Sequence, residues 1–285
     1  MRISVIISTF DSPESLDKVL WGYRCQTHTP WEVIVADDGS GPETVGVVHR
    51  HRGTGRRPLV HVWHPHQEFR KCRILNRAIE RATGDYLIFS DGDCIPRADF
   101  VATHARLARP GRALSGGCIR VSYETSDAIT RDAILSGHCM EADWLRRHGA
   151  GSMRSRLKIV ASNGPTGALL DRLTPTRASF NGHNASAWRD DVIRVNGFDE
   201  RMQYGGLDRE LGERLIHAGV RFRHVRHRAI CLHLEHPRPY VSEASWLRNQ
   251  EIRSETRRHR LTWTPFGIVQ EEAAAEVAIP LRVAA

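Results

Sequence analysis

Apolar runs alternate with amphipathic segments along the first 107 residues of the chain. The apolar runs have the length and continuity of strands that are buried on both faces. They predict strands at residues 3–9, 31–40, 59–64 and 85–90. Apolar residues at helical spacing predict helices at residues 13–26, 42–52, 70–83 and 100–107. Strands that alternate with helices in this way indicate an α/β fold with a parallel sheet and right-handed crossovers.

Polar residues follow three of these strands at the point where each strand ends. They are the loop from Thr9 to Asp11, the pair Asp37–Asp38 and the triplet Asp91–Gly92–Asp93. In a parallel sheet, ligands bind in the crevice beyond the carboxyl ends of the strands. We therefore expect all three groups to face one crevice.

The second half of the chain has a weaker pattern. Residues 126–175 are polar, rich in Arg and interrupted by Gly, with one helical pattern over 128–144, and we expect an insertion near the site here. The remaining predicted elements are a strand at 112–124, a strand followed by a helix at 189–195, a helix ended by Gly219, two short strands within 220–236, with an alternating strand pattern over 225–234, and a basic helix at 245–261. The Ala-rich tail at 271–285 fits either a frayed or a helical end.

The triplet Asp91–Gly92–Asp93 places two carboxylates directly after a buried strand. Two such carboxylates repel each other and burial raises their pKa values, so we expect a positive group to meet them. A D-x-D arrangement of this kind can bind a divalent cation that is held mainly by phosphate oxygens. An ordinary Asx turn after a strand is the alternative, and the triplet alone favours that alternative.

The 285-residue chain has a net charge of +8, and its 41 basic residues are mostly Arg. This charge fits either solvated faces or an anionic partner such as phosphate groups, nucleic acid or a membrane surface. The six cysteines form no C-x-x-C pair, no secretory signal is visible, and no apolar run is long enough to span a bilayer. We therefore expect reduced cysteines and a cytoplasmic protein, with peripheral contact at the inner membrane face as an open alternative.

Four segments occur in an order that is typical of one enzyme family. They are S-T-F-D at 8–11, V-A-D-D-G-S at 35–40, the stretch from Phe69 to Cys94, and N-G-F-D-E-R-M-Q-Y-G-G-L-D-R-E-L at 196–211. With these segments the chain resembles the family 2 glycosyltransferases, and its second half resembles a galactosyltransferase-type C-terminal segment. The resemblance covers residues 3–237. It implies the GT-A fold, a Rossmann-like nucleotide-sugar-binding fold whose central sheet is mixed and mainly parallel.

The resemblance implies a role for each residue that matches a family motif. Asp37 and Asp38 are implied to hold the base and ribose, with Asp38 on the imide of the base. Asp93 is implied to be the direct metal ligand, and Asp91 to contact the ribose or a metal-bound water. The set implied to bind the nucleotide sugar is Thr9, Asp11, Asp37, Asp38, Arg70, Arg73, Asn76, Asp91, Gly92 and Asp93.

Asp208 matches the acid that the family uses as a general base. An acceptor hydroxyl must lose its proton as it attacks the anomeric carbon, so a carboxylate is needed near that hydroxyl. The family motif usually reads Glu-Asp, whereas this chain has Leu207–Asp208 and so lacks the acid that commonly helps to bind the acceptor. Two alternatives stay open: Asp208 as a simple acid at a helix start, and Glu210 as the base.

Two late histidines match the distance at which the family type places a metal ligand. His236 follows the predicted strand over 225–234 and is the preferred ligand, and His233 is the second choice. Together with Asp93, they are implied to hold Mn²⁺ or Mg²⁺. The residues implied to shape the acceptor and sugar site are Asn181, His183, Asn184, Trp188, Tyr204 and Gly206. Trp188 and Tyr204 can each stack on a sugar face or lie in the core.

The sequence therefore predicts a metal-dependent glycosyltransferase of the hexosyltransferase type. It would move sugar from a nucleotide diphosphate sugar, preferably a UDP-sugar, to an acceptor hydroxyl with inversion, in glycan, polysaccharide or glycolipid biosynthesis. The acceptor would be a glycan, a lipid-linked sugar or a small molecule. The alternatives are a nucleotidyltransferase-like enzyme, a non-catalytic basic nucleic-acid-binding protein and a catalytically silent relative. The chain shows no early Gly-rich phosphate loop and no nucleic-acid-binding motif, and it keeps the key acids, so we expect none of these three.

The domain organisation follows from the same resemblance. We expect one glycosyltransferase domain over residues 1–240, with a nucleotide-binding half at 1–120 and an acceptor and catalytic half at 121–240. Residues 241–285 would form a basic C-terminal helix and tail. That helix, Arg248 to Arg260, either meets an anionic membrane or the phosphates of the acceptor, or is simply solvated.

Overall fold

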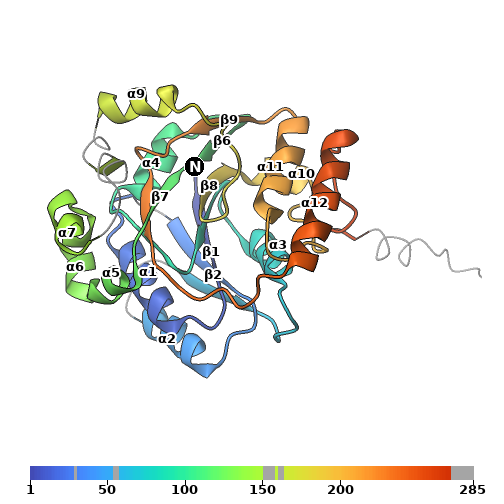
Figure 1. Ribbon diagram of the computed structural model, residues 1–285. Coiled ribbons are helices and arrows are strands. Elements are labelled where there is room, and N and C mark those ends of the chain that lie inside the picture. The colour runs from blue at the N-terminus through green and yellow to red at the C-terminus, as the bar shows by residue number, and fades with distance from the viewer. Residues whose placement is uncertain (29–30, 54–57, 150–157, 160–163, 271–285) are drawn as a thin grey trace, which may run out of the picture.

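A seven-stranded sheet forms the centre of the computed structural model, which describes residues 1–28, 31–53, 58–149, 158–159 and 164–270 (Figure 1). Its strands are β1 (Ile3–Thr9), β2 (Trp31–Asp37), β3 (Leu59–Trp63), β4 (Tyr86–Asp91), β6 (Arg112–Ser115), β8 (Asn184–Trp188) and β9 (Arg221–His224). They are ordered β3-β2-β1-β4-β8-β6-β9, and only β8 runs antiparallel to its neighbours. The predicted α/β fold with a mixed, mainly parallel sheet is confirmed.

Helices connect and cover these strands (Figure 1). The first half contributes α1 (Pro13–Arg24), α2 (Pro42–Arg52), α3 (Lys71–Arg81) and α4 (Phe100–Leu107), and the second half α10 (Arg189–Arg194), α11 (Leu207–His217) and α12 (Glu243–Arg258). All seven agree with the sequence prediction to within a few residues at their ends. The helix α12 packs against α11, and its Ile252 is buried in the core.

The register of the parallel strands places the polar groups at their carboxyl ends at the same height along the sheet. Thr9 at the end of β1 lies opposite Asp37 of β2, and Ser8 lies opposite Asp91 of β4. Because these strands are parallel neighbours, their carboxyl ends meet at the same edge of the sheet. The three polar groups therefore share one edge of the sheet, as a common crevice would require.

Successive residues of the central strands enter two different apolar clusters. Val5 and Ile7 of β1 lie in the cluster that includes Leu16 of α1, whereas Ile6 lies in the cluster that includes Ile74 of α3. Side chains of a strand alternate between the two faces of a sheet, so both faces of β1 are buried under helices. This explains why the central strands read as continuous apolar runs rather than as alternating ones.

The strand predicted at 112–124 is divided between two sheets. β6 ends at Ser115 in the large sheet, and after Gly116 the chain continues as β7 (Gly117–Arg120) in a smaller sheet with β5 (Cys94–Pro96) and β10 (Ile230–His233). A Cβ atom at Gly116 would lie 2.0 Å from the side-chain oxygen of Asn184. Because Gly116 has no side chain, the buried side chain of Asn184 fits at the point where the strand changes sheet. The apolar pattern alone does not reveal this contact.

The single helix predicted over 128–144 is also corrected by the structure. The segment contains α5 (Tyr123–Ala128), α6 (Arg131–Leu135), the 3₁₀ turn η1 (His138–Met140) and α7 (Ala142–Arg147). Thr130 ends the first pattern because its side chain caps α6, accepting a hydrogen bond from the Ala133 amide. Gly137 breaks the next turn with a φ of +81°. Later in the predicted insertion, the structure describes α9 (Pro165–Leu173).

The alternating strand predicted over 225–234 is shorter than expected. Only Ile230–His233 forms a strand, because Val225 to Ala229 fold into a turn in which the Ala229 amide donates to the Val225 carbonyl. The predicted Ala-rich tail at 271–285 lies outside the described residues. Among helices in the described ranges, none combines the length and apolar character that crossing a membrane requires.

Candidate active site

A cavity of about 1250 Å³ lies at the carboxyl ends of β1 and β4 and extends to the start of α11 and the end of β10. Residues from both halves of the chain line it. The predicted site residues in its wall are Thr9, Asp11, Asp38, Asp91, Gly92, Asp93, Asn181, His183, Tyr204, Gly206, Asp208, His233 and His236. The fold therefore gathers most of the predicted residues around one space.

Asp38 lines this cavity, whereas Asp37 does not. Asp37 is fully buried, accepts a hydrogen bond from the Ser40 amide at 2.8 Å and lies 2.8 Å from His61 Nε2. The carboxylate of Asp38 accepts from the Arg70 amide at 2.9 Å and contacts His64 Nε2 at 2.7 Å. Burial raises the pKa of Asp38 and lowers that of His64. Asp37 thus shapes the loop that presents Asp38.

The loop after β1 holds an unusual backbone conformation. Asp11 has a φ of +37°, and its carboxylate accepts a hydrogen bond from the Gly41 amide at 2.7 Å. The conformation is sparsely populated for a non-glycine residue, so the loop is held by its contacts. Beside it, the hydroxyl oxygen of Thr9 is buried without a hydrogen-bond partner among the described residues. The rings of Phe10 and His66 stack with centroids 4.5 Å apart at the cavity wall, an apolar surface that the sequence analysis missed.

Lys71 is the positive group that meets the D-G-D carboxylates, and the sequence analysis did not identify it. Its ammonium lies 2.7 Å from Asp91 Oδ1, which also accepts from Ser8 Oγ at 2.7 Å. Burial acts to lower the pKa of Lys71, but the charges of Asp91 and Asp208 raise it above its usual value. The sequence contains a signal for this role. Lys71 directly follows Arg70, which was predicted to bind the nucleotide, and it is the first residue of α3, the helix that packs beneath this edge of the sheet.

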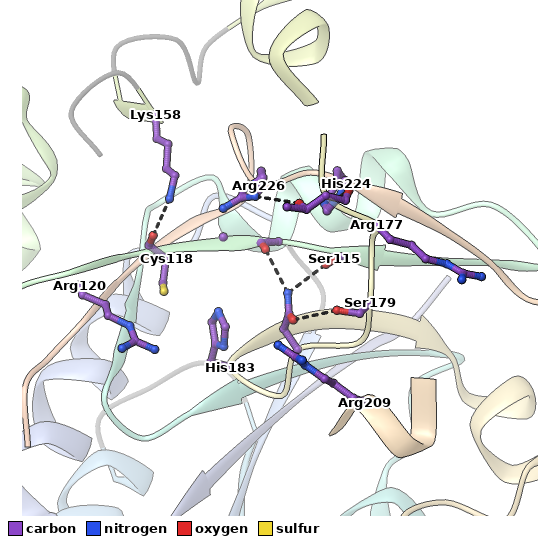
Figure 2. A pocket seen from close by; sticks show the side chains of 14 residues that line it. Ser115, Cys118, Arg120, Lys158, Arg177, Ser179, His183, Arg209, His224 and Arg226 are labelled. Carbon is purple, nitrogen blue, oxygen red and sulfur yellow. Dashed lines mark hydrogen bonds between the residues drawn. The ribbon is translucent and has the colours of Figure 1, made fainter. Parts of the chain in front are cut away.

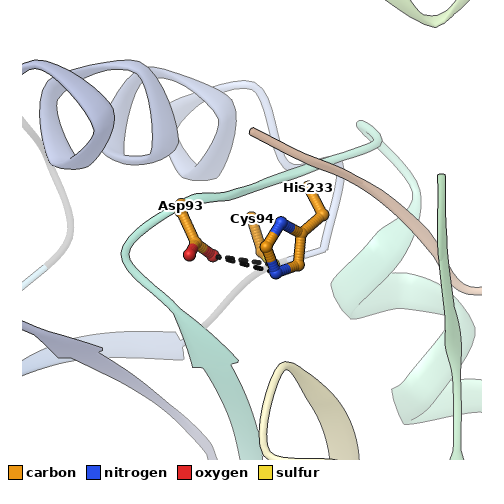
Figure 3. Close-up of side chains that lie close together, drawn as sticks. All are labelled: Asp93, Cys94 and His233. Atoms are coloured by element: carbon orange, nitrogen blue, oxygen red, sulfur yellow. Dashed lines mark hydrogen bonds and ion pairs between the residues drawn. The ribbon is translucent and has the colours of Figure 1, made fainter. Parts of the chain in front are cut away.

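Asp93 lies beside the imidazole of His233 and the thiol of Cys94 (Figure 3), and the imidazole of His236 also contacts it. Its carboxylate lies 2.9 Å from His236 Nε2 and 3.9 Å from His233 Nε2, and the Cys94 thiol donates to it at 3.2 Å. Burial acts to raise the pKa of Asp93, but the hydrogen bond from His236 and the charge of His233 bring it well below its usual value. Burial raises the pKa of Cys94, so its sulfur stays protonated and serves as a donor.

The donor set around Asp93 suits a transition metal. Carboxylate oxygens suit both Mn²⁺ and Mg²⁺, whereas imidazole nitrogens are ligands of transition metals and not of Mg²⁺, which prefers oxygen ligands. The two histidine rings stack with centroids 5.9 Å apart and both lie in the cavity wall. The residues present therefore fit the predicted divalent metal, with Mn²⁺ as the better match.

Asp208 projects toward Gly182 from the second position of α11. A Cβ atom at Gly182 would lie 2.4 Å from Asp208 Oδ1, so the carboxylate occupies space that only glycine leaves free. This oxygen is buried and has no hydrogen-bond partner among the described residues. Burial raises the pKa of Asp208 to about 6, against the lowering effect of Lys71. A buried carboxylate with a pKa near neutral and a free lone pair can act as a proton acceptor.

Glu210, the rival base, points away from the cavity. Its carboxylate is buried and forms a two-point ion pair with Arg214, with distances of 2.8 and 2.7 Å. Thr256 of α12 donates to it at 2.9 Å. Arg214 in turn donates to the carbonyls of Val195 and Gly197. Both carboxylate oxygens of Glu210 have partners, so Glu210 stabilises the packing of α11, and Asp208 is the acid of α11 that lines the cavity.

Several residues predicted for the site do not line this cavity. Asn76 is buried beneath the sheet edge and exchanges hydrogen bonds with the backbone of Phe198, and Asn184 donates to the carbonyls of Gly117 and Ala229. Trp188 pairs with Tyr86 at the opposite end of β4, so it cannot reach a sugar in the cavity. Residues of the predicted set outside the cavity wall are Asp37, Arg70, Arg73, Asn76, Asn184 and Trp188.

Three aromatic side chains cluster at the mouth of the cavity, and only Tyr204 among them was predicted for the site. The rings of Tyr204 and Tyr240 have centroids 5.1 Å apart, and Phe69 lies 5.5 Å from Tyr240. Asn249 of α12 fixes the adjacent loop by donating to the carbonyls of Tyr204 and Gly205. Gly206 then adopts a φ of +86°, which favours glycine and starts α11. The aromatic faces can bind a sugar by stacking.

Comparisons with known proteins agree with the fold. A relative from Bacillus subtilis named uncharacterized glycosyltransferase YfnE is 26% identical over 268 residues, covering 83% of this chain and 66% of that protein. Protein CgeD from the same organism is 29% identical over 98 residues, covering 33% of this chain and 23% of that protein. The chain thus spans less than two thirds of the length of either relative.

Solved structures show the same architecture. A mannosyltransferase from Pyrobaculum calidifontis, solved with GDP-Man and Mn²⁺, superposes with a TM-score of 0.57 at 20% identity, covering 84% of this chain and 58% of that one. TarS of S. aureus, solved with UDP-GlcNAc, gives a TM-score of 0.59 at 15% identity, covering 88% of this chain and 64% of that one. At these identities the likeness shows the shared fold.

Two family models cover most of the chain. The model described as glycosyl transferase family 2 matches residues 4–173. The model described as the N-terminal domain of galactosyltransferase matches residues 175–237. Both agree with the resemblance inferred from the sequence motifs. The chain therefore belongs to glycosyl transferase family 2.

Proposed function

We propose that the protein transfers a sugar from a nucleotide diphosphate sugar to an acceptor hydroxyl in a metal-dependent reaction with inversion. The observation that carries this proposal is the single cavity in which Asp38, Asp93 with its histidines, and Asp208 share one wall. Asp38 would bind the nucleoside, Asp93 with its histidines would serve the diphosphate, and Asp208 would serve the acceptor. Structural neighbours with the same fold bind GDP-Man with Mn²⁺ and UDP-GlcNAc.

The donor would lie along the edge of the parallel strands. Asp38, Thr9 and the stacked Phe10–His66 pair would receive the nucleoside, and a carboxylate such as Asp38 suits the imide of uracil. This favours a UDP-sugar. The ribose and diphosphate would then pass Asp91 and Lys71, whose ammonium offers charge to the phosphate oxygens.

The metal would be held by Asp93 and His236, with His233 beside them. When bound, it would neutralise charge on the diphosphate leaving group. Lys71 adds a second positive charge on the other side of the D-G-D turn, 2.7 Å from Asp91. The protein's own residues thus balance the carboxylates that would otherwise repel a diphosphate.

Asp208 would accept the proton of the acceptor hydroxyl. Its Oδ1 is buried and unpaired among the described residues, and its pKa of about 6 keeps it ionised at neutral pH. Tyr204 and Tyr240 at the mouth would bind the acceptor sugar, with Asn181 and His183 on the opposite wall. We assign residues 1–120 to donor binding, 121–240 to the acceptor and catalysis, and 241–285 to a basic helix and tail.

Thermal unfolding with nucleotide sugars tests the proposal. We expect UDP-sugars to raise the melting temperature only when Mn²⁺ is present, because a ligand that binds the folded state alone stabilises it by mass action. A matched series of GDP-sugars tests the choice of base. Release of free UDP on adding acceptors then reports transfer. Donor binding without turnover on any acceptor would favour a silent relative, and release of pyrophosphate from a nucleoside triphosphate would favour a nucleotidyltransferase.

A further inference from the structure

A second pocket of about 560 Å³ lies next to the active-site cavity and is strongly basic (Figure 2). Its floor is the backbone of Ser115 to Cys118, where the chain leaves the large sheet for the smaller one. The cationic side chains that line it are Arg120, Lys158, Arg177, Arg209 and Arg226. His183 and His224 add two imidazoles, and the lining contains no carboxylate.

These cations have no acidic partner within the described part of the chain. The Lys158 ammonium donates to the Cys118 carbonyl at 3.0 Å, and Arg226 donates to the Thr176 hydroxyl at 3.3 Å, so both are oriented by neutral oxygens. Burial and the nearby charge of Arg226 lower the pKa of Lys158, which shows that like charges face each other here. A cluster of cations held by neutral acceptors keeps its positive potential for a ligand.

Glycines bring the backbone close enough to form this floor. A Cβ atom at Gly117 would lie 2.7 Å from the Arg226 carbonyl oxygen, and one at Gly116 would strike Asn184. The segments that carry Arg120 and Arg226 therefore approach each other closely. The pocket is a consequence of the change of sheet at Gly116 and is fixed by the buried Asn184 amide.

The basic pocket joins the active site at the acceptor side. Four residues line both spaces: Arg120, Asn181, His183 and Arg209. Arg209 directly follows Asp208, the proposed base. In contrast, none of the residues assigned to the donor lines the basic pocket: Thr9, Asp38, Lys71, Asp91 and Asp93 belong to the main cavity alone. The pocket is therefore placed for the acceptor and not for the donor diphosphate.

We propose that the acceptor carries an oxyanion, a phosphate or carboxylate group, which binds in the basic pocket while its hydroxyl reaches Asp208. That the anion belongs to the acceptor rests on the proposed function, whereas the presence of an anion site does not. Guanidinium groups pair with phosphate and carboxylate through two parallel hydrogen bonds, so several arginines around one space suit both anions. The pocket therefore selects anionic acceptors over neutral sugars.

Binding of small probes tests the site without any transfer reaction. We would titrate the metal-free protein with glycerol 1-phosphate, glucuronic acid, glycerol and glucose, and follow binding by ligand-observed NMR. We expect one or both anionic probes to bind and the neutral probes not to bind. Affinity should fall as salt is raised, because the contacts are charged. The comparison of phosphate with carboxylate identifies which oxyanion the pocket prefers.

The double variant Lys158→Gln with Arg226→Gln locates the binding, since both residues line the basic pocket alone. We expect affinity for the anionic probe to fall about tenfold for each cation removed, because a charge-assisted hydrogen bond is worth about that factor. The matched control is Arg81→Gln with Arg106→Gln, two exposed arginines on α3 and α4 that line neither cavity. Equal melting temperatures would show that all variants are folded.

The outcomes separate this proposal from the proposed function. If anionic probes bind no better than neutral ones, or if the double variant binds them as the wild type does, the basic pocket is not an anion site. If the probes bind as expected but no nucleotide sugar stabilises the protein, the anion site stands and the donor assignment fails. With an active acceptor in hand, the double variant should raise KM for the anionic acceptor and leave KM for the donor unchanged.

Discussion

At the proposed nucleoside end of the cavity the carboxylates follow neighbouring parallel strands, whereas at the proposed acceptor end the charged and polar groups stand on a helix start and a loop. Thr9 lies opposite Asp37 and Ser8 opposite Asp91 because the strands of the sheet are in register. Backbone hydrogen bonds thus position the first group. The donor end depends on sheet geometry, which many sequences share.

The acceptor end depends on particular buried side chains instead. Asn184 joins β7 to β10 by donating to Gly117 and Ala229, and the Glu210–Arg214 pair fixes α11, which carries Asp208. A buried polar group that loses its partner costs free energy, so such contacts fix one arrangement. The two ends also differ in charge: acids line the donor end, and unpaired cations line the basic pocket. Each end can therefore be disabled without the other.

Asp208→Asn should produce the largest effect and confine it to the acceptor end. Asparagine keeps the size of the side chain but cannot accept a proton, and general base help is worth about 10² to 10⁴-fold. Turnover should fall by about that factor while donor affinity, measured by calorimetry with Mn²⁺, stays unchanged. Because the raised pKa of Asp208 means that the folded protein disfavours its charge, the variant should remain folded.

Glu210→Gln is the matched control for that variant. Glu210 is in a buried ion pair, and breaking such a pair costs about 3–5 kcal/mol. We expect a large loss in the free energy of unfolding, with the turnover of the remaining folded enzyme preserved. Loss of turnover in Glu210→Gln at full stability, or loss of donor binding in Asp208→Asn, would show that the base is assigned to the wrong residue.

Asp93→Ala should disable the donor end alone. Removal of an outer-shell partner already weakens metal affinity by about 10- to 100-fold, so loss of a direct ligand should exceed that range. Mn²⁺-dependent affinity for UDP-sugar should vanish, whereas binding of glycerol 1-phosphate to the basic pocket should persist. Calorimetry measures the first and NMR titration the second. A variant that keeps its Mn²⁺-dependent donor affinity would exclude Asp93 as a ligand.

The difference between the two ends also explains what the sequence could predict. Apolar runs and the polar residues after them identified β1, β2 and β4 and the edge that they share, since a buried parallel strand has a simple signature. The ordered motifs identified the family. The D-G-D analysis required a positive group, but only the structure showed that it is Lys71.

The acceptor end was less predictable for a physical reason. Gly116 looks like any glycine in a strand pattern, and its role depends on Asn184, which is 68 residues away. Asn76, Asn184 and Trp188 match family segments in sequence, but contacts between distant elements draw them into the core or to the far end of the sheet. Local periodicity carries no information on such contacts, so the change of sheet and the basic pocket were not predicted.

The pH dependence of turnover is a smaller effect. It should depend on Asp208 at the acceptor end and not on Asp93 at the donor end. The pKa of Asp208 is raised to about 6, and only its ionised form can accept a proton. Turnover should therefore be complete above pH 7, halve near pH 6, and fall about tenfold for each further unit of pH. Asp93 has a pKa well below its usual value, so it stays ionised over this range. A turnover profile that is flat between pH 5 and 7.5 would contradict the assignment of Asp208.

The smallest effect concerns α12, where the predicted basic helix divides into two sets of arginines. Arg253 and Arg257 pair with Glu213 of α11, with distances of 2.6 and 3.2 Å, so they help to hold α12 against α11. The free set is Arg248 and Arg258 of α12 and Arg260 just after its end, which are exposed and have no ion pair within the described ranges. Trp246 and Leu247 on the same helix are about half exposed, at 52% and 51%.

We predict that the free set of α12 binds anionic membranes, since a basic residue near such a surface contributes about 1 kcal/mol and exposed apolar side chains can enter the interface. Replacing Arg248, Arg258 and Arg260 by Glu should lower co-sedimentation with phosphatidylserine vesicles by several fold per residue, with no change on neutral vesicles. The same replacement at Arg77, Arg81 and Arg106, which are exposed on other helices, changes the net charge by the same amount and is the control. Equal losses in both variants would show a general effect of charge, and no loss in either would mean that α12 is simply solvated. Because Trp246 also lines the active-site mouth, a membrane bound at α12 would lie beside the site where the acceptor enters.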